Sequence, residues 1–350
     1  MELRKRRGLM SALVLVNVGV PTVFLAVRLI LHAAAPRTYG PAGGENIYTG
    51  LVAGLMYVFG FIVAATLGCT AGSVDLSEGM FRHLVVTGRS RLALYLARIP
   101  AGLAIIWPLV ALGFTVVCAV CVFAAPKAIA YDGASVPAGL SQSGFENWAA
   151  SHADTVVCDF PFNQNISINI PCGGPNGGQF TQAPPASGGP TVSSPAAVKA
   201  AAVQIAAQDY LPYRRLFLYP SDSLMIRSGL WIELEATIGF MVGLGLASLL
   251  GQRTVAVILL FVLEVVLTPV LSRAHLPHLS NLQRAAVGLA TAHLEPGGLP
   301  FVFGGGGGPG GGQGTSQLLP ESTTVAVCVI LAWMAGWTLL GAWRMVTRDA

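Results

Sequence analysis

The ionisable side chains that could do chemistry are concentrated between two long apolar stretches, in the segment Gly72–Arg98. Its charged and titratable members are Asp75, Glu78, Arg82, His83, Arg89, Arg91 and Arg98. Apolar residues recur there at helical spacing, and Glu78 precedes Arg82 by four residues, in the order that supports a helix. The pattern predicts a short amphipathic helix that is suited to dock a partner protein.

Three further acidic residues, Glu233, Glu235 and Glu264, stand in apolar surroundings. An ionised carboxylate in such a stretch is costly unless it faces a cavity or a partner. Glu264 falls near the middle of its stretch, so a functional role and a structural pairing are both open for it. Glu233 and Glu235 fall near an end of theirs, where we expect them to reach water.

Composition assigns the chain to the membrane proteins. Only 10% of the residues are charged and 53% are hydrophobic, with a mean hydropathy of +0.65, whereas soluble domains carry about 25% charged residues. The small net charge of +4 gives no reason to expect nucleic-acid binding. Apolar runs of about 20 residues predict an all-α fold with about six transmembrane helices, at Leu9–Leu31, Ile47–Cys69, Leu94–Ala124, Leu230–Leu250, Val255–Leu271 and Thr324–Trp343.

Basic residues predict the orientation of these spans. A basic run, Met1–Arg7, precedes the first span, and the short segments Gly72–Arg98, Gly251–Thr254 and Arg344–Ala350 are also basic. Because Lys and Arg resist translocation, we expect these segments and both termini to be cytoplasmic, in a multi-pass protein of the cell membrane. A cleaved secretory signal is the alternative for the N-terminus. Its apolar run exceeds the roughly 7–15 residues of a signal core, which favours an uncleaved anchor.

Two long segments separate the remaining spans. The sequence divides into an N-terminal membrane half (1–124), an extracytoplasmic insertion (125–227) and a C-terminal membrane half (228–350) whose outer loop, 272–322, is glycine-rich. The insertion is rich in Pro, Gly, Ser and Asn, and is either a small folded cap or a partly disordered segment. Cys158 and Cys172 both fall in it, and we expect a disulfide between them because the outer compartment is oxidising.

Small residues recur every fourth position in the fourth predicted span, at Gly239, Gly243, Ala247 and Gly251, and Gly68 and Gly72 do likewise in the second. Such a face lets two helices approach closely, and the two helices can belong to one chain or to two chains of a dimer.

Motifs for a metalloprotease helix, a serine nucleophile or a phosphate-binding loop are absent from the sequence. We therefore expect no catalytic residue, metal or cofactor in this chain.

The charged segment resembles a known family. Gly79-Met80-Phe81-Arg82, followed by Thr87-Gly88-Arg89-Ser90-Arg91 and a span entered at Leu94–Arg98, is similar to the cytoplasmic stretch of ABC-2 type permeases. The basic N-terminus, the six spans and the basic tail fit that family too. The resemblance covers the membrane portion and excludes the two outer insertions. It departs from the family pattern at Met80, where Thr is usual, and at Glu78, which abuts the glycine without a spacer.

The resemblance implies a membrane subunit of an ATP-driven exporter, with two permease halves paired to two copies of a separate ATP-binding subunit. The second permease half is another copy of this chain or a homologue. In this interpretation Asp75, Glu78 and Arg82 belong to the helix that couples ATP hydrolysis to transport. The alternative is a non-transporting membrane protein whose extracytoplasmic insertion is a receptor or assembly module.

Overall fold

The computed structural model describes residues 7–35, 39, 41–77, 90–131, 134–159, 195–217, 220–273, 280–296, 299 and 321–347. The chain forms two compact units. The first, a helical bundle, comprises residues 1–24, 48–119 and 221–350, and the second comprises residues 25–47 and 120–220. Each unit is described by itself below.

In the described part of the chain, six helices are long and apolar enough to cross a membrane, which confirms the predicted all-α class with about six spans. They run over Gly8–Ala34, Ile47–Ser73, Arg91–Phe123, Asp222–Leu250, Arg253–Leu271 and Thr323–Thr347. The largest change from the predicted bounds concerns the fourth span, which begins at Asp222 and not at Leu230. The hydroxyl oxygen of Ser221 accepts a hydrogen bond from the Leu224 amide (3.2 Å) and caps this earlier start.

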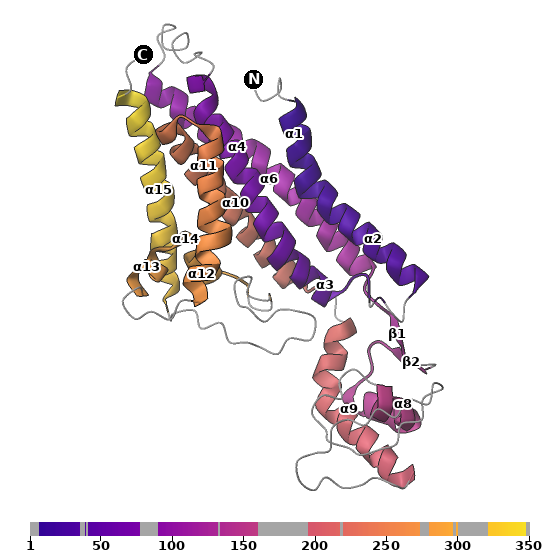
Figure 1. Ribbon diagram of the computed structural model, residues 1–350. Coiled ribbons are helices and arrows are strands. Elements are labelled where there is room, and N and C mark those ends of the chain that lie inside the picture. Colours follow the sequence, from indigo (N-terminus) through magenta and orange to yellow (C-terminus); the bar gives the residue numbers. More distant parts are fainter. Residues whose placement is uncertain are drawn as a thin grey trace. The chain divides into compact units, whose positions relative to one another are not determined.

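The helices of the bundle are labelled in Figure 1. Three spans contain a π-helical turn, a geometry that is frequent at functional sites. The elements are α1 (Arg7–Val14), η2 (Leu15–Gly19) and α2 (Val20–Ala34); α3 (Glu45–Gly50), η3 (Leu51–Met56) and α4 (Tyr57–Ser77); α6 (Arg91–Phe123); α10 (Asp222–Leu250); α11 (Arg253–Phe261), η4 (Val262–Leu267) and α12 (Thr268–Arg273); α13 (Ser280–Ala285) and α14 (Val287–Ala292); and α15 (Thr323–Thr347).

The centre of the bundle is the contact between α4 and α10. Glycines on both helices let the backbones meet: a Cβ added to Gly243 would lie 2.7 Å from the carbonyl oxygen of Ala65, and one added to Gly72 would lie 2.5 Å from that of Leu244. Gly239 faces Phe61 in the same way. The repeated small residues of α10 therefore pack within the chain. Gly251 is the exception, because it ends α10 in a left-handed conformation, with φ of 72°.

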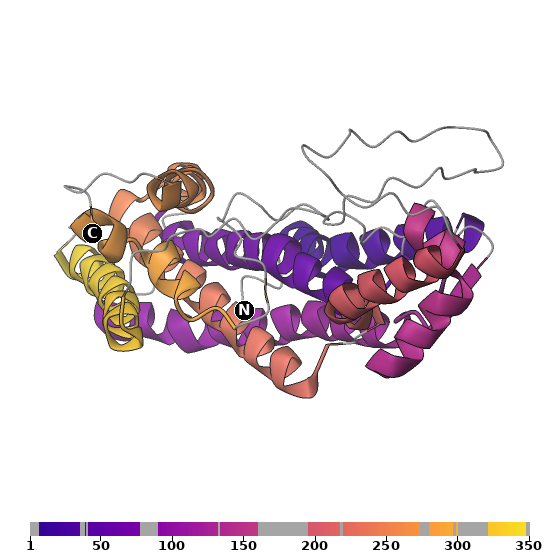
Figure 2. The same cartoon turned by 90° about the horizontal axis from the view of Figure 1, so that it is seen from below.

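The other spans surround this pair. Phe61, Ala65, Val242, Leu260 and Ile330 belong to one buried apolar cluster that joins α4, α10, α11 and α15. The helix α15, yellow in Figures 1 and 2, lies at one edge of the bundle in both views.

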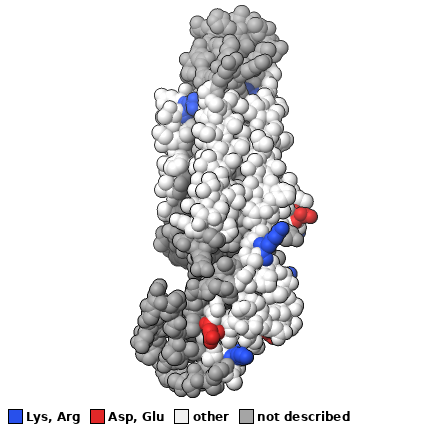
Figure 3. All heavy atoms as spheres, turned by 90° about the vertical axis from the view of Figure 1, so that its right-hand side faces the viewer, with Lys and Arg blue, Asp and Glu red and all other residues white. Residues whose placement is uncertain are grey.

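The described face of the bundle in Figure 3 is white along most of its length, with Lys and Arg atoms near its upper end. Such an uncharged surface is what lipid requires.

One end of the bundle is basic. Arg98 of α6 donates a hydrogen bond to the carbonyl oxygen of Ala71 near the end of α4 (2.9 Å), and Arg91 reaches the carbonyl oxygen of Val346 near the end of α15 (3.5 Å). These contacts bring the end of the second span, the start of the third and the end of the sixth together. The same three ends lie on one side of the membrane when consecutive spans cross it in alternating directions. Arg253 begins α11 after the turn at Gly251, at this same end (Figure 1).

The second unit contains a folded part of the long insertion. A hairpin of β1 (Ala128–Tyr131) and β2 (Ala134–Pro137), with Ile129 opposite Val136, precedes α7 (Gln142–Ser151), α8 (Ala153–Asp159) and α9 (Pro195–Phe217). Phe145 stacks on Tyr213 with ring centroids 4.0 Å apart, and the Tyr213 hydroxyl donates to the carbonyl oxygen of Pro137 (2.5 Å). The described residues of the insertion thus form a small folded unit, and residues 160–194 lie outside the described part of the chain.

We expect Gly243→Ala to destabilise the protein by about 1–3 kcal/mol, because the added methyl group must push α10 away from the backbone of α4. Thermal unfolding of the purified chain in detergent measures the effect. Gly336→Ala in α15 is the matched control, since nothing lies within 4 Å of a Cβ added there. A melting temperature for Gly243→Ala equal to that of the control would contradict the close α4–α10 contact.

Candidate functional site

Two side chains from distant parts of the sequence form a hydrogen bond inside the bundle. The hydroxyl of Tyr57 donates to Oε1 of Glu264 over 2.5 Å. Tyr57 follows the π-helical turn η3 directly, and Glu264 lies within the turn η4. Glu264 is only 3% exposed, so the mid-span carboxyl group singled out in the sequence is held by the second span and faces the protein interior.

A second carboxyl group lies beside this pair. Glu235 of α10 is 2% exposed and interacts electrostatically with Glu264, while the Thr291 side chain is close enough to form a hydrogen bond with it. The indole of Trp231, one turn earlier on α10, stacks on the Tyr57 ring with centroids 5.1 Å apart and donates to the carbonyl oxygen of Thr291 (3.1 Å). The Tyr57 hydroxyl thus holds the Glu264 carboxyl group, and the Trp231 indole holds the Tyr57 ring in place beside it.

The short helix α14 closes the site from the side of α15. All of its residues are buried, and its Gly288 approaches so closely that a Cβ there would lie 2.5 Å from Oε1 of Glu264. Just beyond α14, burial raises the pKa of Glu295 to about 8, so this residue is mostly uncharged at neutral pH. Nearby, Nδ1 of His293 lies 3.9 Å from Oε2 of Glu321.

The site is acidic and has no cationic partner among the described residues: Lys and Arg form no ion pair there with Glu235 or Glu264. Oε1 of Glu235 and Oε2 of Glu264 are buried and accept no hydrogen bond from the described part of the chain. Across the described residues, no group of three or more His, Cys, Asp or Glu side chains has the arrangement of a metal site. The geometry suits hydrogen bonding by carboxyl groups.

The structure separates the acidic residues that the sequence analysis grouped. Glu235 does not reach water as expected, because α10 begins before its predicted start and Glu235 turns into the bundle beside Glu264. Glu233 lies on another face of α10 and lines a groove against α6. Asp75 falls in the last turns of α4, where only its backbone is described, and Glu78 and Arg82 lie outside the described residues.

The disulfide between Cys158 and Cys172 also stays a prediction. Cys158 is in α8, where only its backbone is described, and Cys172 lies outside the described residues. The residues of the acidic site that were not identified from the sequence are Tyr57, Thr291 and Glu295. A Tyr or Thr in an apolar run gives little signal, but an acidic residue such as Glu295, close after another apolar stretch, could have been counted with Glu264.

Glu264→Leu removes the acceptor of the Tyr57 hydroxyl, and we expect it to destabilise the protein by about 1–3 kcal/mol. Glu264→Gln keeps an acceptor oxygen at the same position, so its melting temperature should stay close to that of the unchanged protein. Differential scanning fluorimetry in detergent compares them. Val266→Leu, at a position that is 49% exposed, is the control for introducing Leu into this span. Equal melting temperatures for Glu264→Leu and Val266→Leu would argue against a structural hydrogen bond.

No family model, curated protein or solved structure among those compared with the chain matches it. The described residues contain six helices that are long and apolar enough to cross a membrane. By the length and hydropathy of its helices, the chain is a multi-pass membrane protein.

Proposed function

We propose that this chain is the permease subunit of an ABC-2 type exporter. It moves a substrate across the cytoplasmic membrane with ATP that a separate subunit hydrolyses. Two permease halves, either two copies of this chain or this chain and a homologue, pair with two copies of the ATP-binding subunit. The observation that carries the proposal is the charged segment Gly72–Arg98, whose residues resemble the cytoplasmic stretch of that family.

The basic end of the bundle supports this proposal. The charged segment begins at the end of α4 and finishes in α6, at the end where Arg98 binds the carbonyl oxygen of Ala71 and Arg91 reaches that of Val346. A cytoplasmic ATP-binding subunit needs a surface on the side that retains Lys and Arg, and this end supplies one. Asp75 lies in the last turns of α4 at this end, and a coupling helix with Glu78 and Arg82 would follow it, placed to pass motion from the ATP-binding subunit to the second and third spans.

A second candidate function is a receptor or assembly module that does not transport. It is favoured by the second unit, where Val136, Phe145, Ile205 and Tyr213 form a buried core of their own. A folded cap of this kind offers a surface for a partner outside the membrane. The two candidates differ in one requirement, because only the exporter needs an ATP-binding subunit.

Charge reversal at the proposed coupling helix tests the exporter. We expect Arg82→Glu to lower the amount of ATP-binding subunit held on the membrane by about tenfold, the effect of losing about 1.4 kcal/mol of charge complementarity. The measurement co-expresses the chain with the ATPase encoded beside its gene and quantifies that ATPase in washed membranes.

Lys199→Glu is the matched control for this experiment, because Lys199 is exposed on α9 in the second unit. Equal retention of the ATPase by both variants would show that Arg82 makes no such contact. If no neighbouring gene encodes an ATPase, or if none is retained by the unchanged chain, the receptor or assembly module becomes the better candidate.

The proposed orientation has its own test. In intact cells, a membrane-impermeant maleimide should label Ser187→Cys in the insertion and leave Arg89→Cys unlabelled, because Arg89 belongs to the basic segment that stays inside. Both variants are made with Cys158 and Cys172 replaced by Ser, and permeabilised cells show that each introduced thiol can react. Labelling of Arg89→Cys alone in intact cells would reverse the orientation and place the charged segment outside.

A further inference from the structure

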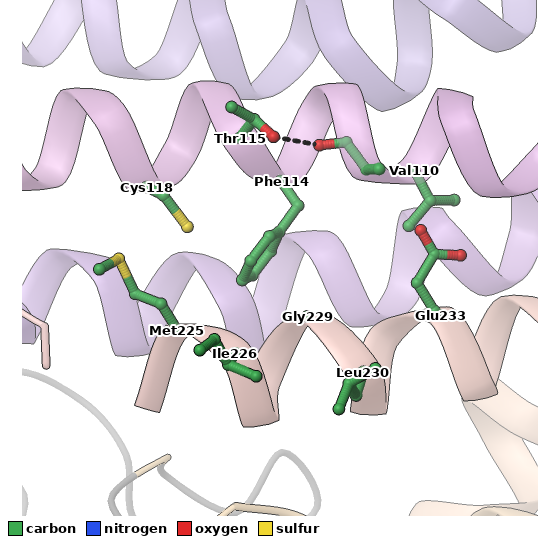
Figure 4. Close-up of a pocket in the computed structure, with 10 residues that line it drawn as sticks. Val110, Phe114, Thr115, Cys118, Met225, Ile226, Gly229, Leu230 and Glu233 are labelled. Carbon is green, nitrogen blue, oxygen red and sulfur yellow. Dashed lines mark hydrogen bonds between the residues drawn. The ribbon is translucent and has the colours of Figure 1, made fainter. Parts of the chain in front are cut away.

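A groove opens between α6 and α10 on the side of the bundle. It encloses about 420 Å³ and is lined by five residues from each helix (Figure 4). Phe114 and Cys118 of α6 face Met225 and Leu230 of α10 across it. The volume falls within the range of about 300–1,000 Å³ that is usual for small-molecule sites.

The groove exists because, among the described residues, the contacts between α6 and α10 are made by side chains, without a close approach of the two backbones. Phe114 lies over Gly229, where a Cβ would come within 3.0 Å of its ring, and Phe240 fills the space beside Gly102 in the same way. The indole of Trp107 donates to the hydroxyl of Thr237 (3.0 Å). Between such contacts the two helices stay apart, and the space between them opens to the surroundings, since Leu230 at its edge is 67% exposed.

One carboxyl group stands in this apolar groove. Glu233 is the single charged side chain among the lining residues, and Figure 4 shows its carboxyl group turned from α10 toward Val110 of α6. Its Oε2 atom is buried and accepts no hydrogen bond from the described residues. The nearby hydroxyl groups are engaged elsewhere: Thr115 donates to the carbonyl oxygen of Ala111 (2.7 Å), and Thr237 to that of Glu233 (2.7 Å).

We propose that this groove binds a hydrophobic amine, with its ammonium group on the Glu233 carboxylate and its apolar body between Phe114, Cys118 and Met225. A carboxylate beside lipid is costly unless a cation or donor joins it, and an ammonium group supplies both. A lipid acyl chain would fill the apolar walls and leave Oε2 of Glu233 without a donor. The site goes beyond the proposed function, because binding needs neither ATP nor a second subunit.

Two small molecules of similar shape, one charged and one uncharged, test the proposal. The full chain in phosphatidylcholine nanodiscs is titrated with 4-phenylbutylamine or with 4-phenylbutanol, which is similar in shape and uncharged, and empty nanodiscs give the partitioning background. Because a charge-assisted hydrogen bond contributes about 1.5–3 kcal/mol, we expect the amine to bind at least about tenfold more tightly than the alcohol. Glu233→Gln should remove this difference, while Asp222→Asn, an acid-to-amide change at an exposed position of α10, should keep it.

A second measurement needs no variant. Peptide mass spectrometry follows the alkylation of Cys118, which lines the groove, and of Cys328, which is exposed on α15, in the same sample. The amine should slow the alkylation of Cys118 severalfold and leave that of Cys328 unchanged. Equal binding of amine and alcohol, undiminished amine binding by Glu233→Gln, or alkylation of Cys118 that does not respond to the amine would each overturn the proposal. The last result would mean that lipid or a second copy of the chain covers the groove.

Discussion

The close contact between α4 and α10 is the constraint on which the rest of the bundle depends. In lipid, helices gain little from hiding apolar surface and associate through packing, which small residues improve. Gly68, Gly72, Gly239 and Gly243 remove the side chains that would separate the two backbones. Because α4 and α10 touch along these glycines, Tyr57 of α4 and Trp231 of α10 stack face to face. The same contact brings the Tyr57 hydroxyl close to the carboxyl groups inside the bundle. The acidic site is a consequence of this contact.

The membrane fold could be predicted from the sequence because its signals are local. A run of apolar residues must become a helix in lipid, where every backbone polar group needs a partner within the segment. The start of α10 could not be found this way, since Ser221 and Asp222 are polar and the helix there is set by a capping hydrogen bond. The helices α13 and α14 lie in the segment 272–322, which was assigned from the sequence as a glycine-rich outer loop, and each helix is too short for a clear pattern.

The candidate site was only half predictable for a related reason. Glu264 could be found, because one acidic residue in an apolar run is conspicuous. Its partner Tyr57 could not, since the two are joined by a contact between residues 207 positions apart, and nothing in the sequence specifies which helices meet. Glu295 contributes through burial, which raises its pKa and depends on α14 packing against the spans. Pairing and burial are properties of the tertiary structure.

The two acidic residues of α10 illustrate how much helical geometry alone decides. Glu233 and Glu235 are two positions apart, which turns their side chains by about 200° around the helix axis. One therefore faces α6 and the groove, and the other faces Tyr57 and Glu264. Inside the bundle, Glu235 and Glu264 lie beside the hydroxyl groups of Tyr57 and Thr291, whereas Glu233 in the groove has mainly apolar neighbours, and the hydroxyl groups near it donate to backbone carbonyl oxygens. The same residue type thus has a structural environment on one face of α10 and an environment suited to a ligand on the other.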